Sequence, residues 1–148
     1  MKNRYHIPTP LYKKILAVMP VLTVDIVIAH EGKFLLLKRA IAPAKGQWWT
    51  PGGRVLKGEK LEEAARRKAK EETNISVDIV KFLGIYEIPE KRWGIPVHAV
   101  TVVYMARPRR KSSVIKMNFN NNDAKWFKAI PRNANPFVEK FLLVAGFH

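Results

Sequence analysis

The sequence contains no cysteine. Disulfides, thiolate metal sites and a cysteine nucleophile are therefore excluded. Long hydrophobic runs are also missing. The longest, residues 21–29, is interrupted by Asp25, whereas a membrane span needs roughly 20 apolar residues. Lys2 and Arg4 near the N-terminus are not followed directly by an apolar stretch, so we expect no signal peptide. These absences predict a cytoplasmic protein without a membrane segment.

Acidic residues are scarce, because 12 Asp and Glu stand against 27 Lys and Arg, which gives a formal net charge of +15. Excess positive charge attracts anions, so a phosphorylated small molecule, a nucleic acid or an anionic membrane surface would each suit this protein. Solubility alone would explain the charge equally well. The basic cluster at residues 107–111 has no interleaved aromatic residues, so nucleic acid is not the favoured partner.

The hydrophobic pattern predicts one α/β domain over residues 1–148, long enough and apolar enough for a single core. Strand and helix patterns alternate along the chain, which predicts a mixed sheet with helices packed on it. We expect helices at 9–19, 59–73 and 135–144, and strands at 21–29, 34–39, 48–49, 77–88, 97–106 and 124–130, with a loop between 88 and 97.

The helix expected over residues 59–73 turns charged side chains towards the sheet. At about 100° per residue, Leu61 and the alanines fall on one broad arc, and Lys68 and Glu72 fall inside the same arc. A charge on a core-facing side is costly unless it is paired or binds a metal. The alternative is an ordinary surface helix, with i,i+4 ion pairs made by Arg67 to the glutamates on either side of it.

A turn rich in glycine, residues 51–53, precedes this helix. Glycine lets the backbone come close to a ligand. A carbonyl from Gly52, together with the carboxylates of Glu71 and Glu72, would make an all-oxygen site suited to Mg²⁺. Such an ion can bridge phosphate oxygens and neutralise charge on a diphosphate leaving group.

The spacing over residues 53–75 resembles the Nudix box, G-x5-E-x7-R-E-U-x-E-E-x-G-U, in which U is aliphatic. Lys68 replaces the first glutamate after the arginine, and Asn74 replaces the late glycine, although Asn tolerates a left-handed backbone. The resemblance implies a Nudix-like α/β/α sandwich around a mixed β-sheet, hydrolysis of a nucleoside diphosphate linked to another group, a Mg²⁺ or Mn²⁺ cofactor, and a homodimer. The matching residues are Gly53, Glu59, Arg67, Ala69, Glu71, Glu72 and Ile75.

One branch of the family, the GDP-mannose mannosyl hydrolases, is especially similar over segments 24–27, 37–39, 43–48, 51–55 and 61–65. That branch also lacks the glutamate replaced here by lysine. It uses one metal on the diphosphate, and water attacks the sugar at C1. Its histidine base is absent from residues 119–123 here.

The resemblance and the residues together give a set of candidate site residues. A buried carboxylate needs a partner, and Arg39 on the neighbouring strand is the obvious one for Asp25. The tryptophans would stack on a nucleobase or fill the core. Glu87 and Glu90 are alternative metal ligands from outside the helix, but solvated loop carboxylates are the favoured interpretation. His98 is an alternative base, but a packed or hydrogen-bonded strand histidine is favoured. The candidates are Asp25, Arg39, Arg67 and Asp123 as catalytic residues, Arg39, Trp49 and Trp93 for the substrate, and Gly52, Glu71, Glu72 and Asn120 for the metal.

The favoured function is metal-dependent hydrolysis of a nucleotide sugar such as GDP-mannose. ADP-ribose or a nucleoside triphosphate are alternative substrates. Glu71 restores a pair of carboxylates and favours attack at phosphorus, so attack at carbon and attack at phosphorus both stay open. Lys68 and the missing histidine motivate a different class, a non-catalytic module that binds nucleotide or RNA.

Overall fold

The computed structural model describes residues 5–42, 44–111, 115–116 and 120–148. Pro43 and Phe119, which belong to segments used in the sequence comparison above, lie outside these residues. The elements in chain order are α1 (Thr9–Val18), β1 (Val21–His30), β2 (Lys33–Arg39), β3 (Trp48–Trp49), β4 (Gly52–Arg54), α2 (Leu61–Thr73), β5 (Val77–Arg92), β6 (Ile95–Pro108), β7 (Asn121–Phe127) and α3 (Pro136–Val144).

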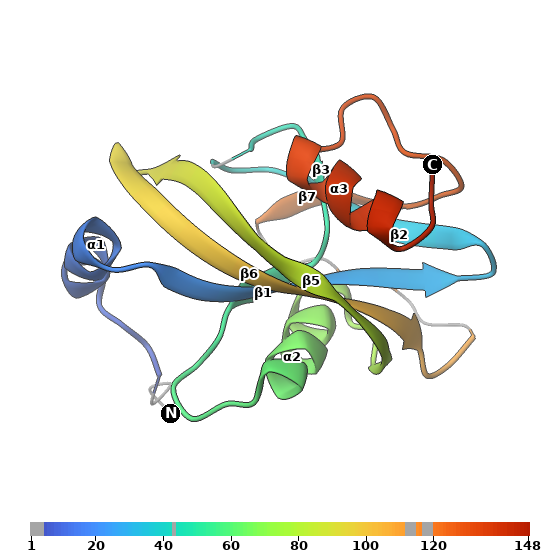
Figure 1. Ribbon diagram of the computed structural model, residues 1–148, viewed down its shortest axis with the longest axis horizontal. Coiled ribbons are helices and arrows are strands. Elements are labelled where there is room, and N and C mark those ends of the chain that lie inside the picture. The colour runs from blue at the N-terminus through green and yellow to red at the C-terminus, as the bar shows by residue number, and fades with distance from the viewer. Residues whose placement is uncertain (1–4, 43, 112–114, 117–119) are drawn as a thin grey trace.

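The sheet is mixed, and β1 lies at its centre (Figure 1). The strand order is β3-β2-β1-β6-β5, with β4 paired to β1 and β7 paired to β2. β1 runs parallel to β6, from Val21 opposite Ala99 to Ile28 opposite Ala106. The pairs with β2 and β4 are antiparallel. This mixed sheet with flanking helices confirms the predicted fold class.

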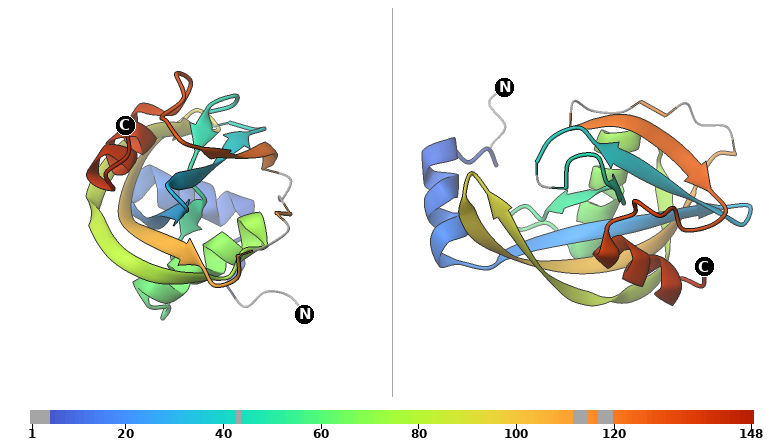
Figure 2. Two further views of the ribbon diagram at one scale, coloured as in Figure 1. Left: turned by 90° about the vertical axis from the view of Figure 1, so that its right-hand side faces the viewer. Right: turned by 90° about the horizontal axis from the view of Figure 1, so that it is seen from above.

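The two faces of the sheet are covered by different helices, α2 on one side and α3 on the other (Figures 1 and 2). Val24, Ile26 and Ile28 of β1 belong to the apolar cluster that contains the alanines of α2. Val27, between them in sequence, belongs to the cluster that contains Phe141 of α3. Because alternate residues of a strand point to opposite faces, β1 needs apolar side chains on both faces, and its sequence is apolar apart from Thr23, Asp25 and His30.

Helix ends agree with the local sequence signals. Asn74 ends α2 in the left-handed conformation with φ 64°, which confirms the predicted cap. Asn135 caps α3, its side chain accepting a hydrogen bond from the Phe137 backbone N–H, and Pro136 stands in the first turn. Among the described residues, no helix has both the length and the apolar character that a membrane crossing requires.

The loop expected between residues 88 and 97 is wrong, because β5 and β6 continue into one long hairpin that turns at Trp93 and Gly94. Both turn residues have positive φ, 50° and 73°, as a tight two-residue hairpin requires. The prolines that suggested a loop lie where a strand has a free edge. β5 is an edge strand, and Pro96 precedes the point at which β1 joins β6 at Ala99.

Helix α1 packs at one end of the sheet, beside the tip of this hairpin (Figure 2). Leu16 is buried against Val21 and Val97. At the tip, the ring of Trp93 meets the ring of Tyr12 edge-on, with centroids 6.2 Å apart. The helix and the hairpin therefore form one wall at this end of the molecule.

Candidate active site

A cavity of about 170 Å³ opens between α1, the centre of the sheet and the β5–β6 hairpin. We call the part of the cavity formed by Asp25, Arg39 and Glu72 its charged end. Tyr12 and Leu16 of α1 also line the cavity, and the Tyr12 ring lies near the guanidiniums of Arg54 and Arg92. The cavity also touches Gly52 and Gly53, as the sequence predicted for a ligand site next to that turn. The lining residues that carry charge are Asp25, Arg39, Arg54, Glu72, Glu90 and Arg92.

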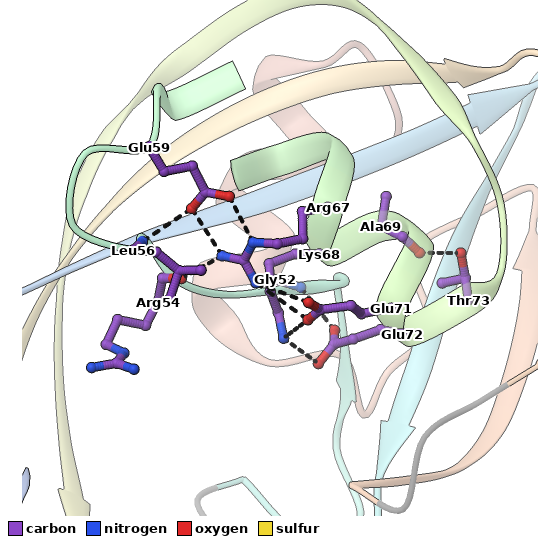
Figure 3. Close-up of polar contacts among 10 residues, drawn as sticks. All are labelled: Gly52, Arg54, Leu56, Glu59, Arg67, Lys68, Ala69, Glu71, Glu72 and Thr73. Carbon is purple, nitrogen blue, oxygen red and sulfur yellow. Dashed lines mark hydrogen bonds and ion pairs between the residues drawn. The ribbon is translucent and has the colours of Figure 1, made fainter. Parts of the chain in front are cut away.

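Glu72 reaches the cavity from the inner face of α2. Its residue is only 5% exposed, and its Oε2 accepts a hydrogen bond of 2.9 Å from the backbone N–H of Gly52 (Figure 3). The alanines at 64, 65 and 69 are fully buried, so the helix lies close against the sheet and carries Glu72 inwards with it. The inward arc predicted from helical periodicity is confirmed.

Gly52 lies so close to β1 that no side chain fits there. A Cβ built on Gly52 would lie 2.6 Å from Oδ1 of Asp25 and would also overlap the carbonyl oxygen of Val24. The close approach is set by the antiparallel pairing of β4 with β1, in which Asp25 is opposite Gly52. Glycine is required here by space, and it brings the backbone of the turn against two buried carboxylates.

Lys68 points into the same region from α2 (Figure 3). Its Nζ lies 3.2 Å from Oε2 of Glu71 and 3.7 Å from Oε1 of Glu72. The side chain of Lys68 is 16% exposed, whereas that of Glu71 is 49% exposed. The lysine therefore places a positive charge beside both of the carboxylates that the sequence proposed as metal ligands.

Arg67 joins the helix to the loop before it rather than facing the cavity. Its guanidinium donates to both carboxylate oxygens of Glu59, at 2.6 and 3.0 Å, and to the Arg54 carbonyl at 3.0 Å. It also donates to Glu71 at 3.1 Å (Figure 3). The hydrogen bonds from Arg67 are the main reason that the pKa of Glu59 is lowered.

Asp25 is a buried carboxylate held by three side-chain donors. Thr101 donates to Oδ2 at 2.6 Å, and Trp49 Nε1 and Thr50 Oγ1 donate to Oδ1, each at 3.0 Å. Burial raises the pKa of Asp25 to about 6, although these hydrogen bonds oppose the rise. The hydrogen-bond partners of Asp25 are thus two hydroxyl groups and an indole N–H. Arg39, the partner expected from the sequence, has a charge–charge interaction with Asp25.

Arg39 ends β2 at the cavity, where the pairing with β7 shifts register between Lys38 and Arg39 and sets Asn121 opposite it. Burial lowers the pKa of Arg39, while the nearby carboxylates of Glu72, Glu90 and Asp25 raise it. An arginine among three carboxylates keeps its charge, since a guanidinium is protonated at any ordinary pH. Asn121, which also lines the cavity, was not among the predicted residues.

The interpretation of Glu90 as a solvated loop carboxylate is wrong, because Glu90 lines the cavity together with Ile88 and with Arg92, which sequence reasoning missed. The three residues alternate along β5 and so share one face of the strand. The sequence signal for these residues was their alternation along a strand, but we expected a loop over this segment and so did not use it. By contrast, Glu87 and His98 pair with each other on the exposed face, 3.4 Å apart.

Several predicted residues do not line the cavity. Asp123 is exposed on β7, and its Oδ1 accepts from the Ala124 N–H. Asn120 is half-buried, and its carbonyl accepts a hydrogen bond of 2.8 Å from Ala40 N–H. Trp93 is 51% exposed at the hairpin tip. The candidates on the cavity surface are Asp25, Arg39, Trp49, Gly52 and Glu72.

Comparison with known proteins identifies the family. A family model for the NUDIX domain matches residues 19–134. The chain belongs to the NUDIX family. It is 32% identical to the low-salt glycan biosynthesis protein Agl8 of Haloferax volcanii over 151 residues, which cover 95% of this chain and 92% of that protein. It is 42% identical to the ADP-ribose pyrophosphatase of Methanocaldococcus jannaschii over 72 residues, 49% of this chain and 43% of that protein.

Solved structures agree with this assignment. The MutT NUDIX hydrolase of Burkholderia pseudomallei superimposes with a TM-score of 0.72 at 26% identity, covering 83% of this chain and 95% of that one. The protein is therefore a hydrolase of the NUDIX family. NUDIX hydrolases act on nucleoside diphosphate derivatives and generally use a divalent metal, usually Mg²⁺.

The residues at this NUDIX site suit a metal ion whose coordination is completed by the substrate. Within the described residues, no three His, Cys, Asp or Glu side chains converge to hold an ion. Mg²⁺ rarely needs such a cage, because it is usually bound by one or two carboxylates together with waters and substrate phosphates. Glu72 supplies one carboxylate on the surface of a cavity that Arg39 also lines, and Glu71, the preceding residue, is a second carboxylate that does not line the cavity.

Proposed function

We propose that this protein hydrolyses a nucleoside diphosphate derivative, with a nucleotide sugar as the preferred substrate and Mg²⁺, or Mn²⁺, as cofactor. The observation that carries the proposal is the buried carboxylate of Glu72, which faces a cavity shared with Arg39. A carboxylate for the metal and a guanidinium for phosphate oxygens are the two groups that diphosphate chemistry needs.

Each residue at the charged end then has a role. Glu72 would hold the metal with Glu71 and the Gly52 carbonyl, and the metal would neutralise charge that develops on the diphosphate. Arg39 donates to phosphate oxygens, for which its planar guanidinium is suited. Asp25 holds Trp49 by its indole N–H, so the Trp49 ring forms a fixed part of the cavity surface.

A nucleotide sugar is preferred for two reasons. The similarity of residues 24–27 and 51–55 to the mannosyl hydrolase branch points to GDP-mannose. The Haloferax volcanii relative, which matches 95% of this chain, is named for glycan biosynthesis. The Methanocaldococcus jannaschii relative is named for ADP-ribose, which is itself a nucleoside diphosphate linked to a sugar. ADP-ribose and nucleoside triphosphates are therefore the other substrates to test.

The test is a panel of nucleotide sugars, ADP-ribose, dinucleotides and nucleoside triphosphates with Mg²⁺ or Mn²⁺. Hydrolysis of at least one nucleotide sugar, lost on addition of EDTA, is expected. Reaction in ¹⁸O-labelled water then shows the attacked atom, since label appears on the sugar after attack at carbon and on phosphate after attack at phosphorus. Absence of turnover on the whole panel would contradict the proposal.

One observation favours a second function, a non-catalytic module that binds nucleotide or RNA. Lys68 places an ammonium group beside Glu71 and Glu72, where a catalytic metal would compete with it. Tight RNA binding that weakens steeply with salt, without metal-dependent hydrolysis, would support this alternative.

Light scattering during gel filtration tests the homodimer that the family resemblance implies.

A further inference from the structure

The β5–β6 hairpin contributes a continuous wall to the cavity. Ile88, Glu90 and Arg92 of β5 face it, and Val97 and Ala99 of β6 lie beside them. In the pairing of the two strands, Glu90 is opposite Val97. A carboxylate is thus presented between apolar neighbours on the inner surface of a two-stranded ribbon.

Glu90 has no partner of its own in the part of the chain that the structure describes, where no hydrogen bond or ion pair reaches its carboxylate. Burial raises its pKa, while Arg92 and Arg39 act in the opposite direction through their charge. A half-buried carboxylate without a donor is unfavourable. Its presence on a cavity wall suggests that a ligand supplies the donor.

Helix α1 closes the same end of the cavity with Tyr12 and Leu16. These residues lie outside the part of the chain, 19–134, that the family model matches. The guanidiniums of Arg54 and Arg92 lie 5.2 and 6.0 Å from the centroid of the Tyr12 ring. This end of the cavity is therefore built partly from an element that the shared domain lacks, as expected of a region that selects among substrates.

We propose that Glu90 is a specificity-determining residue that accepts hydrogen bonds from hydroxyl groups of the sugar joined to the diphosphate. The assignment rests on the proposed function, because it assumes that the charged end of the cavity binds the diphosphate.

The chemistry around Glu90 favours a hydroxyl over the other parts of such a substrate. A phosphate only accepts hydrogen bonds and is repelled by a carboxylate. A hydroxyl both donates and accepts, so it suits a carboxylate with the guanidiniums of Arg39 and Arg92 in electrostatic range. A nucleobase stacks on an aromatic face, and the Trp49 ring held by Asp25 offers one elsewhere on the cavity surface, whereas the Tyr12 ring already contacts two guanidiniums.

The experiment compares the affinities of a nucleotide sugar and of the matching nucleotide without the sugar. GDP-mannose with GDP, and ADP-ribose with ADP, are titrated calorimetrically into wild type and Glu90→Ala, with Ca²⁺ replacing Mg²⁺ to suppress turnover. Glu90→Ala should weaken binding of the nucleotide sugar about 10- to 100-fold relative to that of its nucleotide. A nucleoside diphosphate is more negative than its sugar ester, so Glu90→Gln, which removes the same negative charge as Glu90→Ala, measures the effect of charge on the ratio. Glu90→Gln, which keeps one acceptor, should show a smaller change.

Glu87→Gln is the matched control, since Glu87 lies on the same strand and faces outwards towards His98. In Glu87→Gln, the ratio of the affinity for the nucleotide sugar to the affinity for its nucleotide should equal that of wild type. An equal loss of both ligands in Glu90→Ala would place Glu90 against the nucleoside and overturn the assignment, as would no change in either. If wild type binds none of the four ligands, the proposed function itself is wrong and the role of Glu90 falls with it.

Discussion

Lys68 Nζ lies 3.7 Å from Oε1 of Glu72, the buried carboxylate at the charged end of the cavity. The same ammonium lies 3.2 Å from Glu71. Two carboxylates at neighbouring helical positions repel each other, and the lysine offsets that repulsion without a metal. The protein therefore carries a positive charge of its own beside the two carboxylates that we propose as metal ligands.

Replacing this lysine should strengthen metal binding. In Lys68→Gln, the positive charge that competes with the metal is removed, while a side chain of similar length remains. Over about 4 Å near a protein surface, such a charge changes an interaction by several kcal/mol, so the dissociation constant for Mn²⁺ or Mg²⁺ should fall at least about tenfold. Calorimetric titration of the metal measures it. Lys70→Gln, an exposed lysine of the same helix, should leave the constant unchanged. Equal affinity in wild type and Lys68→Gln would show that Lys68 does not affect the metal.

Loss of the Glu72 charge should abolish hydrolysis and preserve the fold. Glu72→Gln keeps a carbonyl oxygen that can accept the Gly52 N–H, so the contact that positions the turn survives. The variant loses the charge that would hold a metal, and the rate should fall by at least about 10³-fold. The measurements are kcat with Mg²⁺ and the thermal unfolding midpoint. Near-wild-type turnover would remove Glu72 from the metal site.

Arg67 should matter for stability, because it fastens the loop at Glu59 and the Arg54 carbonyl to α2. Arg67→Ala should lower the free energy of unfolding by about 2 kcal/mol, as expected for a partly buried ion pair. The folded-state pKa of Glu59 is below its ordinary value of 4.5, so its contribution is present above pH 4.5 and is lost as the pH falls through the folded-state pKa. The difference between the two proteins should therefore shrink in acid.

Urea unfolding at pH 7 and below pH 4.5 measures this effect. The control is Arg66→Ala, since Arg66 pairs with Glu62 on the exposed face at 3.3 Å. Such surface pairs contribute little, so its cost should be below about 1 kcal/mol. A stable Arg67→Ala protein that has lost only catalysis would instead support the catalytic role suggested by the family pattern.

Asp25 should make the protein less stable as the pH rises. Its folded-state pKa of about 6 is above the ordinary 3.8, so the fold favours the neutral carboxyl. This contribution is fully present below pH 3.8 and is lost as the pH rises through 6, and it amounts to at most about 3 kcal/mol. Asp25→Asn does not titrate, so its stability relative to wild type should increase between pH 4.5 and 7.5. Denaturant unfolding in EDTA measures it, and a relative decrease would contradict the assignment.

Patterns within one element were predicted well. The inward arc of α2, including Glu72, follows from helical periodicity, and the cap at Asn74 follows from a single residue type. The buried strand at 21–29 follows from its apolar character, because both of its faces are covered by helices. In each case the physical cause lies within a few residues of its effect.

Contacts that depend on pairing between elements were not predicted. Thr101, which donates to Asp25, lies 76 positions away and meets it only because β1 and β6 run parallel. Glu59 reaches Arg67 because the helix begins at Leu61 and the preceding loop folds back over it. Glu90 faces the cavity because β5 continues past Ile88 in register with β6, where the sequence predicted a loop.

The meeting of Tyr12 with Trp93 joins a segment outside the shared domain to the tip of a ribbon inside it. Two proteins that share the domain can therefore differ in the helix that lines this part of the cavity, and so in the size of the molecules that they bind. To group such relatives by substrate, the helix that corresponds to α1 must be compared as well as the motif over residues 53–75.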